Sequence, residues 1–350
     1  MGVAIRGTLE EPASPKRAAR RRGPPAGAAK REGGACPPKP RSAKAGYDAV
    51  MSSSHDPDAV PLPASVTWAG GSPLPRLDVA GRHASAQIYL HGAQVAAWQP
   101  AHARGPVLWM SAHSLFKPDK AIRGGVPICF PWFGPHREDK TVPSHGFGRL
   151  TPWTLCDAGE EPDGTVNLTL QLEDDNASPV WPHYFHADLR LSIGRTLTLA
   201  LFVDNPDSIA FSYEAALHTY FSVSHIERVS VSGLENTEYQ DKVSGSHQRQ
   251  DSDPIRFSGE TDRVYLNTLA QCVIHDPGMN RRITIAKRGS GSTVVWNPWV
   301  QKARAMADFG DDEWPGMLCI ETANVGEAAV TLRPGDSHTM TVEIGVEAAE

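Results

Sequence analysis

Apolar residues recur at every second position over long parts of this chain, and this period constrains the fold more than any other feature. The run 166–172 alternates one Val and three Leu with polar residues. A second alternating run, 186–193, is followed after a Gly-Arg turn by another at 196–203, which predicts a β-hairpin. No long segment has the helical period of 3.6. Many short strands separated by turn clusters therefore predict an all-β fold, a large antiparallel β-sandwich.

The N-terminal part of the chain differs in composition from the rest. Residues 1–50 carry 11 Lys and Arg against 4 Asp and Glu, so their net charge is +7, and the remaining 300 residues carry −13 of the total of −6. The segment is rich in Ala, Pro, Gly and Arg and has no hydrophobic periodicity. We therefore predict that 1–64 is a disordered basic segment with a linker and that 65–350 form one domain. A targeting peptide, a nucleic-acid-binding tail and a start codon upstream of Met51 are alternative interpretations of the segment.

Several classes of protein are disfavoured by what the sequence lacks. No stretch approaches 18 consecutive apolar residues, and the five cysteines contain no C-x-x-C pair. No H-E-x-x-H motif, Cys/His cluster or dinucleotide fingerprint occurs either. We therefore expect a cytoplasmic monomer without a metal or cofactor. Because the body of the chain is acidic, we expect neither a nucleic acid nor a membrane as partner.

Two cations flank a glycine pair in the middle of the chain. Lys120 and Arg123 are three residues apart, and Gly124 and Gly125 follow them. Glycines permit a tight backbone path, and two cations beside such a turn suit a phosphate or a carboxylate. The alternative is a solvated turn with two surface cations.

Two histidines and a glutamate are candidates for proton transfer. His145 lies in a Ser-His-Gly turn, which leaves its imidazole free to project into a cleft or into solvent. His218 lies among apolar residues of an expected strand, where it is either an inert core histidine or a general acid. Glu321 follows an apolar run, and a carboxylate there is costly unless it is paired or functional. His218 and Glu321 make a plausible acid–base couple.

These segments occur in one characteristic order along the chain. Taken together, they resemble the glucose-6-phosphate 1-epimerase (hexose-6-phosphate mutarotase) family, a branch of the aldose 1-epimerase or galactose mutarotase superfamily. The resemblance runs from about Leu90 to Val346, some three quarters of the chain. Its segments are 91–95 (HGAQV), 108–111 (LWMS), 122–127 (IRGGVP), 144–149 (SHGFGR), 217–221 (LHTYF), 260–265 (ETDRVY), 295–299 (VWNPW), 306–309 (MADF) and 319–321 (CIE).

The resemblance implies a large β-sandwich of the galactose mutarotase type and a role for each of eight residues. It assigns Glu321 as general base, His218 as general acid, His145 and Asp262 as ligands of the sugar or residues that orient its ring, and Lys120 and Arg123 as ligands of the 6-phosphate. Gln94 falls at a position near the phosphate, and Arg149 either contacts the phosphate or braces the loop after His145. Gln94 carries no charge at a position where the family often has a polar or basic residue. No cofactor is implied.

The function that the resemblance implies is interconversion of the α and β anomers of a hexose 6-phosphate, with glucose 6-phosphate as the expected substrate. The ring would open by acid–base catalysis and close again on the other face of the aldehyde. One alternative is an aldose 1-epimerase acting on unphosphorylated sugars, which have no need of Lys120 and Arg123. The other is a non-catalytic protein that binds sugar phosphates, which has no need of both His218 and Glu321.

Overall fold

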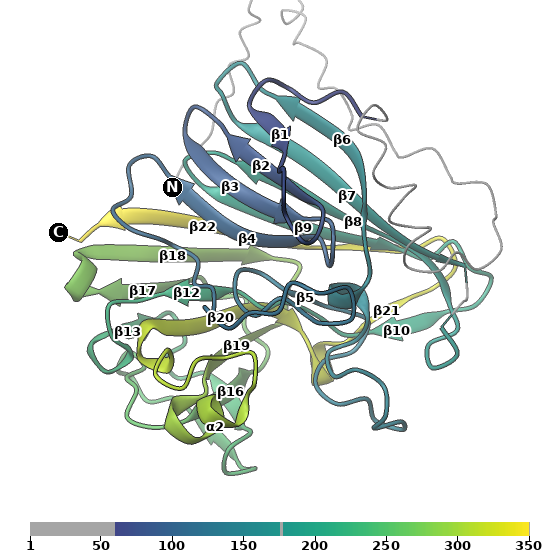
Figure 1. Ribbon diagram of the computed structural model, residues 1–350. Helices are drawn as coiled ribbons and strands as arrows, with labels where there is room; N and C mark the ends of the chain where they lie inside the picture. The colour runs from purple at the N-terminus through teal and green to yellow at the C-terminus, as the bar shows by residue number, and fades with distance from the viewer. Residues whose placement is uncertain (1–59, 176–177, 350) are drawn as a thin grey trace, which may run out of the picture. The chain divides into compact units, whose positions relative to one another are not determined.

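The computed structural model of the chain describes residues 60–175 and 178–349, shown in Figure 1. Antiparallel strands dominate these residues, as the period of two predicts, and the expected β-sandwich is confirmed. Most of the predicted disordered segment, residues 1–59, lies outside the described residues, so its prediction stays untested. The described chain enters its first strand at Val66. No helix among the described residues is both long and apolar enough to span a membrane.

The sheet that carries the functional site, here called the site sheet, has eight strands. Its order is β15-β14-β16-β19-β20-β11-β5, and β12 continues the line of β11 by pairing with β20. The strands are β5 (Ile128–Cys129), β11 (Ala215–Leu217), β12 (Tyr220–Ser222), β14 (Glu238–Asp241), β15 (His247–Arg249), β16 (Thr261–Tyr265), β19 (Ser292–Asn297) and β20 (Met317–Asn324).

A second sheet of eight strands packs against the site sheet, in the order β13-β17-β18-β22-β9-β8-β7-β6. The predicted hairpin is confirmed in it, because β8 and β9 pair from His186 with Asp204 to Ile193 with Leu197. The strands are β6 (Thr154–Glu160), β7 (Val166–Asp175), β8 (Tyr184–Ile193), β9 (Leu197–Asp204), β13 (Ser230–Ser232), β17 (Cys272–Asp276), β18 (Arg281–Arg288) and β22 (Ser337–Ala348).

Smaller elements complete the described part of the chain. A four-stranded sheet contains β1 (Val66–Trp68), β2 (Arg76–Ala80), β3 (Ala84–Tyr89) and β4 (Gln94–Pro100), and a two-stranded sheet contains β10 (Phe211–Tyr213) and β21 (Val330–Leu332). The α-helix is α2 (Trp299–Ala305), and the 3₁₀ turns are η1 (Gly148–Leu150), η2 (Ile226–Arg228), η3 (Pro277–Met279), η4 (Trp314–Gly316) and η5 (Gly326–Ala328).

The main core lies between the two large sheets. It covers one face of the site sheet, so functional side chains can lie only on the other face. Alternate residues of β20, such as Leu318 and Ile320, enter this core with leucines of β8 and β9. Burying each such side chain contributes about 1.5–3 kcal/mol, which fixes the register of β20. Because successive side chains of a strand point to opposite faces, Cys319 and Glu321 must face away from this core.

Candidate active site

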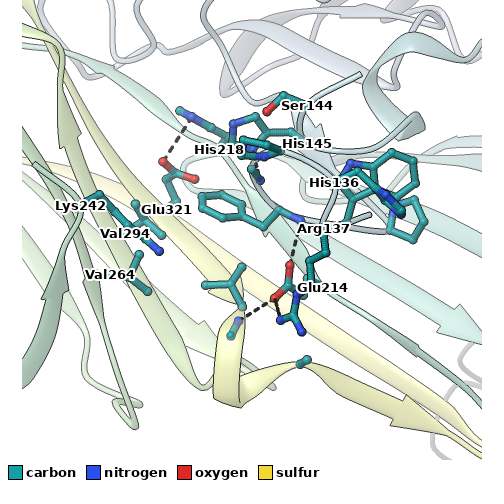
Figure 2. Close-up of a pocket in the computed structure, with 18 of the residues that line it drawn as sticks. His136, Arg137, Ser144, His145, Glu214, His218, Lys242, Val264, Val294 and Glu321 are labelled. Carbon is teal, nitrogen blue, oxygen red and sulfur yellow. Dashed lines mark hydrogen bonds and ion pairs between the residues drawn. The ribbon is translucent and has the colours of Figure 1, made fainter. Parts of the chain in front are cut away.

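A cavity of about 1120 Å³ lies over the face of the site sheet that points away from the main core, and Figure 2 shows its lining. Its floor is formed by side chains of β14, β16, β19 and β20 and by the connection between β11 and β12. Residues 131–138 and 144–149 form its walls, and α2 contributes Lys302. The pocket thus combines a rigid floor with walls made by loops, an arrangement common to small-molecule sites.

His218 and Glu321 are cross-strand neighbours on this floor. The strand segments on either side of His218 pair with β20 in a single antiparallel register, 217 with 322 and 220 with 319. This register places His218 opposite Glu321. Residues opposite each other in such a sheet have Cβ atoms about 4.5–5.5 Å apart, so sheet pairing brings together two residues from distant parts of the sequence.

The other side of Glu321 is apolar. In the same row across the sheet, Glu321 pairs with Val294 of β19, Val294 pairs with Val264 of β16, and Val264 pairs with Gln240 of β14. Figure 2 shows the two valines beside the carboxylate. A carboxylate between a histidine and two valines is poorly solvated, and Glu321 is only 1% exposed.

The imidazole of His218 and the carboxylate of Glu321 contact each other, and each has one further polar atom without a hydrogen-bond partner among the described residues. The Nε2 of His218 lies 3.3 Å from Oε1 of Glu321. The Nδ1 of His218 and the Oε2 of Glu321 are buried and have no hydrogen-bond partner among the described residues. Buried polar atoms are nearly always satisfied, so two unsatisfied ones beside a pocket indicate that a ligand supplies their partners.

Burial shifts the pKa values of the two groups toward each other. It raises the pKa of Glu321 well above its usual value, with the nearby Asp262 carboxylate adding to the effect. It lowers the pKa of His218 well below 6.5, and the positive charges of Arg149 and Arg123 act in the same direction. Both shifts have the same cause, the cost of a buried charge, and both favour a neutral carboxyl group beside a neutral imidazole. Such a pair can exchange the roles of acid and base.

His145 faces the same pair as a neutral imidazole. Its ring centroid lies 5.9 Å from that of His218, and burial together with Arg149 lowers the pKa of His145 to about 3. Its Nδ1 accepts a hydrogen bond from the Gly134 N–H at 3.2 Å, which leaves the proton on Nε2. The turn depends on Gly146, where a Cβ would lie 2.0 Å from the carbonyl oxygen of Phe130.

Arg149 brings an incompletely bonded guanidinium to the pocket. Its Nη2 donates to the carbonyl oxygen of Ser144 at 2.8 Å, whereas its Nε is buried without a hydrogen-bond partner among the described residues. The Ser144 turn thus anchors one end of the guanidinium. The free N–H group remains available to an anion or to a sugar oxygen.

Arg123 lines the pocket but is already held by two partners. Its Nε and Nη2 donate to the Asp308 carboxylate at 3.2 and 3.1 Å, and its Nη1 donates to the Tyr220 hydroxyl at 3.0 Å. These bonds use three of the five N–H groups of a guanidinium and leave two for a ligand. The glycines that follow allow the backbone to pass close to a neighbouring strand, because a Cβ at Gly125 would lie 2.2 Å from the Val95 carbonyl oxygen.

Aromatic stacking connects Arg123 to the histidine. The ring of Tyr220 stacks on His218 with centroids 4.8 Å apart and planes at 12°, and Trp109 stacks on Tyr220 at 5.7 Å. The hydroxyl of this central tyrosine is the group that Arg123 bonds. Arg123 is therefore placed to hold the imidazole plane through Tyr220.

Asp262 lines the pocket from β16. Lys302 of α2 places its ammonium 3.4 Å from Asp262 and 3.0 Å from Glu260. Burial raises the pKa of Asp262, and Lys302 opposes this shift. The two carboxylates neutralise Lys302, whereas Lys242 lines the pocket without an ion pair to a described residue.

Two of the eight expected site residues do not line the pocket in the described structure. Gln94 is 1% exposed and donates from Nε2 to the Gly124 carbonyl oxygen at 2.5 Å. The side chain of Lys120 is 52% exposed and lies 3.3 Å from the Asp119 carboxylate. Gln94 thus braces the glycine turn and Lys120 faces solvent, so their placement does not support the expected phosphate contacts. The other six residues line one pocket.

The sequence reasoning assigned no role to Tyr220, Asp308, Lys242 or Lys302. The period of two offered a signal for Tyr220, because it follows His218 by two positions and must share its face of the strand. Lys242 and Lys302 reach the pocket from a turn and from a helix, and Asp308 reaches Arg123 from a turn. No local pattern in the sequence indicates their positions.

Comparisons with known proteins agree with this geometry. Residues 77–345 match the family model described as aldose 1-epimerase. The chain is 39% identical over 267 residues to a protein of Cenchrus ciliaris and 38% identical over 255 residues to one of Escherichia coli, both named "putative glucose-6-phosphate 1-epimerase". These matches cover 73% and 72% of this chain and 79% and 84% of the relatives.

A solved structure extends the agreement to three dimensions. A protein of Salmonella typhimurium, titled a putative mutarotase, superimposes with a TM-score of 0.76 at 33% identity. The superposition covers 82% of this chain and 95% of that one. The chain belongs to the aldose 1-epimerase family of carbohydrate epimerases.

Proposed function

We propose that this protein interconverts the α and β anomers of a hexose 6-phosphate and that its substrate is glucose 6-phosphate. The observation that carries the proposal is the buried His218–Glu321 pair, whose free atoms Nδ1 and Oε2 lack partners among the described residues. Family membership supports the reaction class, and the names of the relatives support the substrate.

The chemistry follows from a pair that shares one proton. The Glu321 carboxylate takes the proton of the C1 hydroxyl while the protonated imidazole of His218 gives its proton to the ring oxygen O5. The C1–O5 bond breaks, the electron pair of the O1–H bond forms the C1 carbonyl, and the sugar becomes an open-chain aldehyde. Each positioned acid or base contributes about 10²- to 10⁴-fold.

The second half of the reaction runs the same steps backwards on the other face. Rotation about C1–C2 turns the aldehyde, and the hydroxyl on C5 attacks the opposite face of C1. The imidazole now takes the proton of that hydroxyl and Glu321 returns one to O1. The two groups thus exchange the roles of acid and base between ring opening and ring closure.

The neighbouring groups bind and orient the ring in this proposal. Asp262 accepts a sugar hydroxyl, and His145 donates from Nε2 to a sugar oxygen. Both residues line the pocket, and the bonded Nδ1 of His145 fixes which nitrogen donates. Their contribution is positioning, which sets the distance between C1 and the catalytic pair.

The phosphate group is assigned to the cations of the pocket. Arg123 keeps two N–H groups free, and the buried Nε of Arg149 has no hydrogen-bond partner among the described residues. Both guanidinium groups suit a phosphate dianion, which accepts paired N–H donors. Lys302 is matched by two carboxylates and is a weaker candidate. An unphosphorylated sugar offers Arg123 and Arg149 no charge to bind.

The experiment that tests the proposal is exchange spectroscopy on the anomeric protons. Magnetisation transfer between the α and β signals of glucose 6-phosphate is measured with and without the protein, and again with glucose. We expect catalysed exchange with glucose 6-phosphate at a much higher kcat/KM than with glucose. Equal or greater efficiency on glucose would contradict the phosphorylated substrate, and no catalysis on either sugar would contradict the enzyme.

A further inference from the structure

Trp296 adjoins the catalytic pair on the pocket floor and takes no part in the proposed reaction steps. It lies on β19 two positions after Val294, so it shares the pocket face of that strand. Its partner across the sheet is Cys319 of β20, which places Trp296 diagonally across from Glu321. Diagonal neighbours in an antiparallel pair are within reach of an aromatic side chain. The indole lines the pocket and is only 8% exposed.

Trp296 and Tyr220 close the floor over Cys319, which pairs with both residues. Their strands, β19 and β12, flank β20 and are two strand spacings apart, about 9.6 Å. The centroids of the two rings are only 6.0 Å apart, with planes at 79°. The rings therefore lean toward each other over β20, and Cys319 beneath them is fully buried.

The indole also contacts the imidazole of His218. The two centroids lie 5.9 Å apart with planes at 79°, so the edge of one ring meets the face of the other. Tyr220 is stacked on the same imidazole with centroids 4.8 Å apart. Two aromatic rings thus cover His218 from two directions.

The size of Trp296 matters because other neighbours of Glu321 on this face are small. Ala323 follows Glu321 by two positions on β20, and Val294 lies directly opposite. The free Nδ1 of His218 and Oε2 of Glu321 would both hydrogen-bond to a water molecule that reached them. Replacing the indole by a smaller side chain would open room for such water beside the pair.

We propose that Trp296 keeps water away from the His218–Glu321 pair and thereby restricts the pair to one proton at neutral pH. Trp296 is in this view a positioning residue, because it acts on the reaction through the pair. The inference deepens the proposed function and rests on it, since the pair is the one assigned to ring opening. Water stabilises charged forms of buried groups. With water admitted, His218 would be protonated at a higher pH and Glu321 would ionise at a lower pH.

The other groups that act on the charge of the pair stay in place when Trp296 is replaced. They come from the wall turns, from β16 and α2, and from the strands beneath the pair, and they are Arg123, Cys129, His145, Arg149, Cys319, Tyr220, Asp262 and Lys302. A changed titration of His218 in a Trp296 variant therefore reports the loss of the indole.

The test is the pH titration of the His218 imidazole, followed by NMR on the full chain with labelled histidine. The signal is assigned by comparison with His218→Asn. In the unmodified chain we expect His218 to stay neutral as the pH falls through 6.5. In Trp296→Leu the midpoint should rise by about one pH unit or more, because desolvation shifts a fully buried group by up to 3–5 units.

A conservative variant keeps the test decisive. Trp296→Phe retains an aromatic ring in the same place, so its midpoint should lie between those of the unmodified chain and Trp296→Leu. If the leucine variant does not fold, the phenylalanine variant carries the test with a midpoint still above that of the unmodified chain.

The pH profile of anomer exchange on glucose is a second readout. The pH at which kcat falls on the acid side should rise in Trp296→Leu together with the His218 midpoint. The matched control is Trp132→Leu, because Trp132 also lines the pocket and is also 8% exposed. Its ring contacts are with His136 and Phe147. The control should keep the His218 midpoint and the pH profile of the unmodified chain.

Three results would overturn the role of Trp296. One is a His218 midpoint near 6.5 in the unmodified chain, because the pair would then already be hydrated. Another is a midpoint that stays the same in the Trp296 variants, and the third is an equal rise in Trp132→Leu. The titration needs no turnover. An unmodified chain without anomer exchange would thus contradict the proposed function, while the titration would still decide whether Trp296 excludes water from the pair.

Discussion

Arg123 has two expected roles, and a comparison of two variants separates them. It bonds Tyr220, which stacks on His218, and it keeps free N–H groups for a phosphate. Arg123→Ala removes both roles at once. Tyr220→Phe removes only the hydroxyl that Arg123 bonds and keeps the ring stacked on His218. Comparing the two variants therefore distinguishes a loss of kcat/KM on both sugars from a loss on the phosphorylated sugar alone.

The expected magnitudes follow from the bonds involved. The hydrogen bond of 3.0 Å from Arg123 to Tyr220 joins a charged donor to a buried hydroxyl, and such a bond contributes about 1.5–3 kcal/mol. If the lower part of that range reaches the transition state, Tyr220→Phe lowers kcat/KM about tenfold for glucose 6-phosphate and for glucose alike. Arg123→Ala loses this factor on both sugars and a further factor of about 10² on glucose 6-phosphate alone, the scale of a lost phosphate contact.

The assay is anomeric exchange on both sugars, reported as the ratio of the two kcat/KM values. Tyr220→Phe should leave that ratio unchanged, and Arg123→Ala should lower it about 10²-fold. Thermal unfolding of each variant checks that the fold survives, because the alanine leaves Asp308 without its bidentate partner. Equal losses on both sugars in Arg123→Ala would refute the phosphate role of Arg123. A changed ratio in Tyr220→Phe would show that the Tyr220 hydroxyl also affects phosphate recognition, and would refute the separation of the two roles.

Three further predictions use the same assay. On glucose, which has no phosphate to titrate, kcat should be constant around neutral pH and should fall only at a pH well below 6.5. Addition of a second proton would make the buried His218–Glu321 pair cationic, and burial opposes this charge. Loss of the remaining proton would make the pair anionic, which burial also opposes. An acid limb at 6.5 would mean a solvated histidine. Asp262→Asn should raise KM about tenfold or more on both sugars, since a charge-assisted hydrogen bond is lost, and an unchanged KM would remove Asp262 from the sugar site. A chain beginning at Met51 should fold and exchange anomers like the full chain, because the described core and the family match lie beyond it; loss of soluble, active protein would contradict this.

The architecture was predictable from the sequence because strand burial has a simple period. The alternation in 166–172 lies in β7 of the second sheet, and the Gly-Arg turn after 193 connects β8 with β9. The pairing of β11 and β12 with β20 had no such signal. The meeting of His218 and Glu321 depends on a register set by the core residues of β20, and spacing in the sequence carries no information about it.

The phosphate residues show where spacing misleads. Lys120 and Arg123 were expected to face one ligand because three positions separate them. Residues that far apart share a face on a helix, but residues 120–123 form bends and irregular structure and no helix. Arg123 turns into the pocket to reach Asp308 and Tyr220, whereas Lys120 turns to solvent beside Asp119. The partners that hold Arg123 come from distant parts of the chain, so no local pattern could indicate its direction.

The central claim is that His218 and Glu321 together open the sugar ring, and anomeric exchange in two conservative variants tests it most directly. Glu321→Gln keeps the shape of its side chain, His218→Asn keeps a polar amide in place of the ring, and each removes the ability to carry the transferred proton. The exchange rate on saturating glucose 6-phosphate should fall about 10²-fold or more in each variant. Because the two groups act as one unit, the double variant should be little worse than either single one. Near-full exchange in either single variant, with its fold intact, would contradict the account.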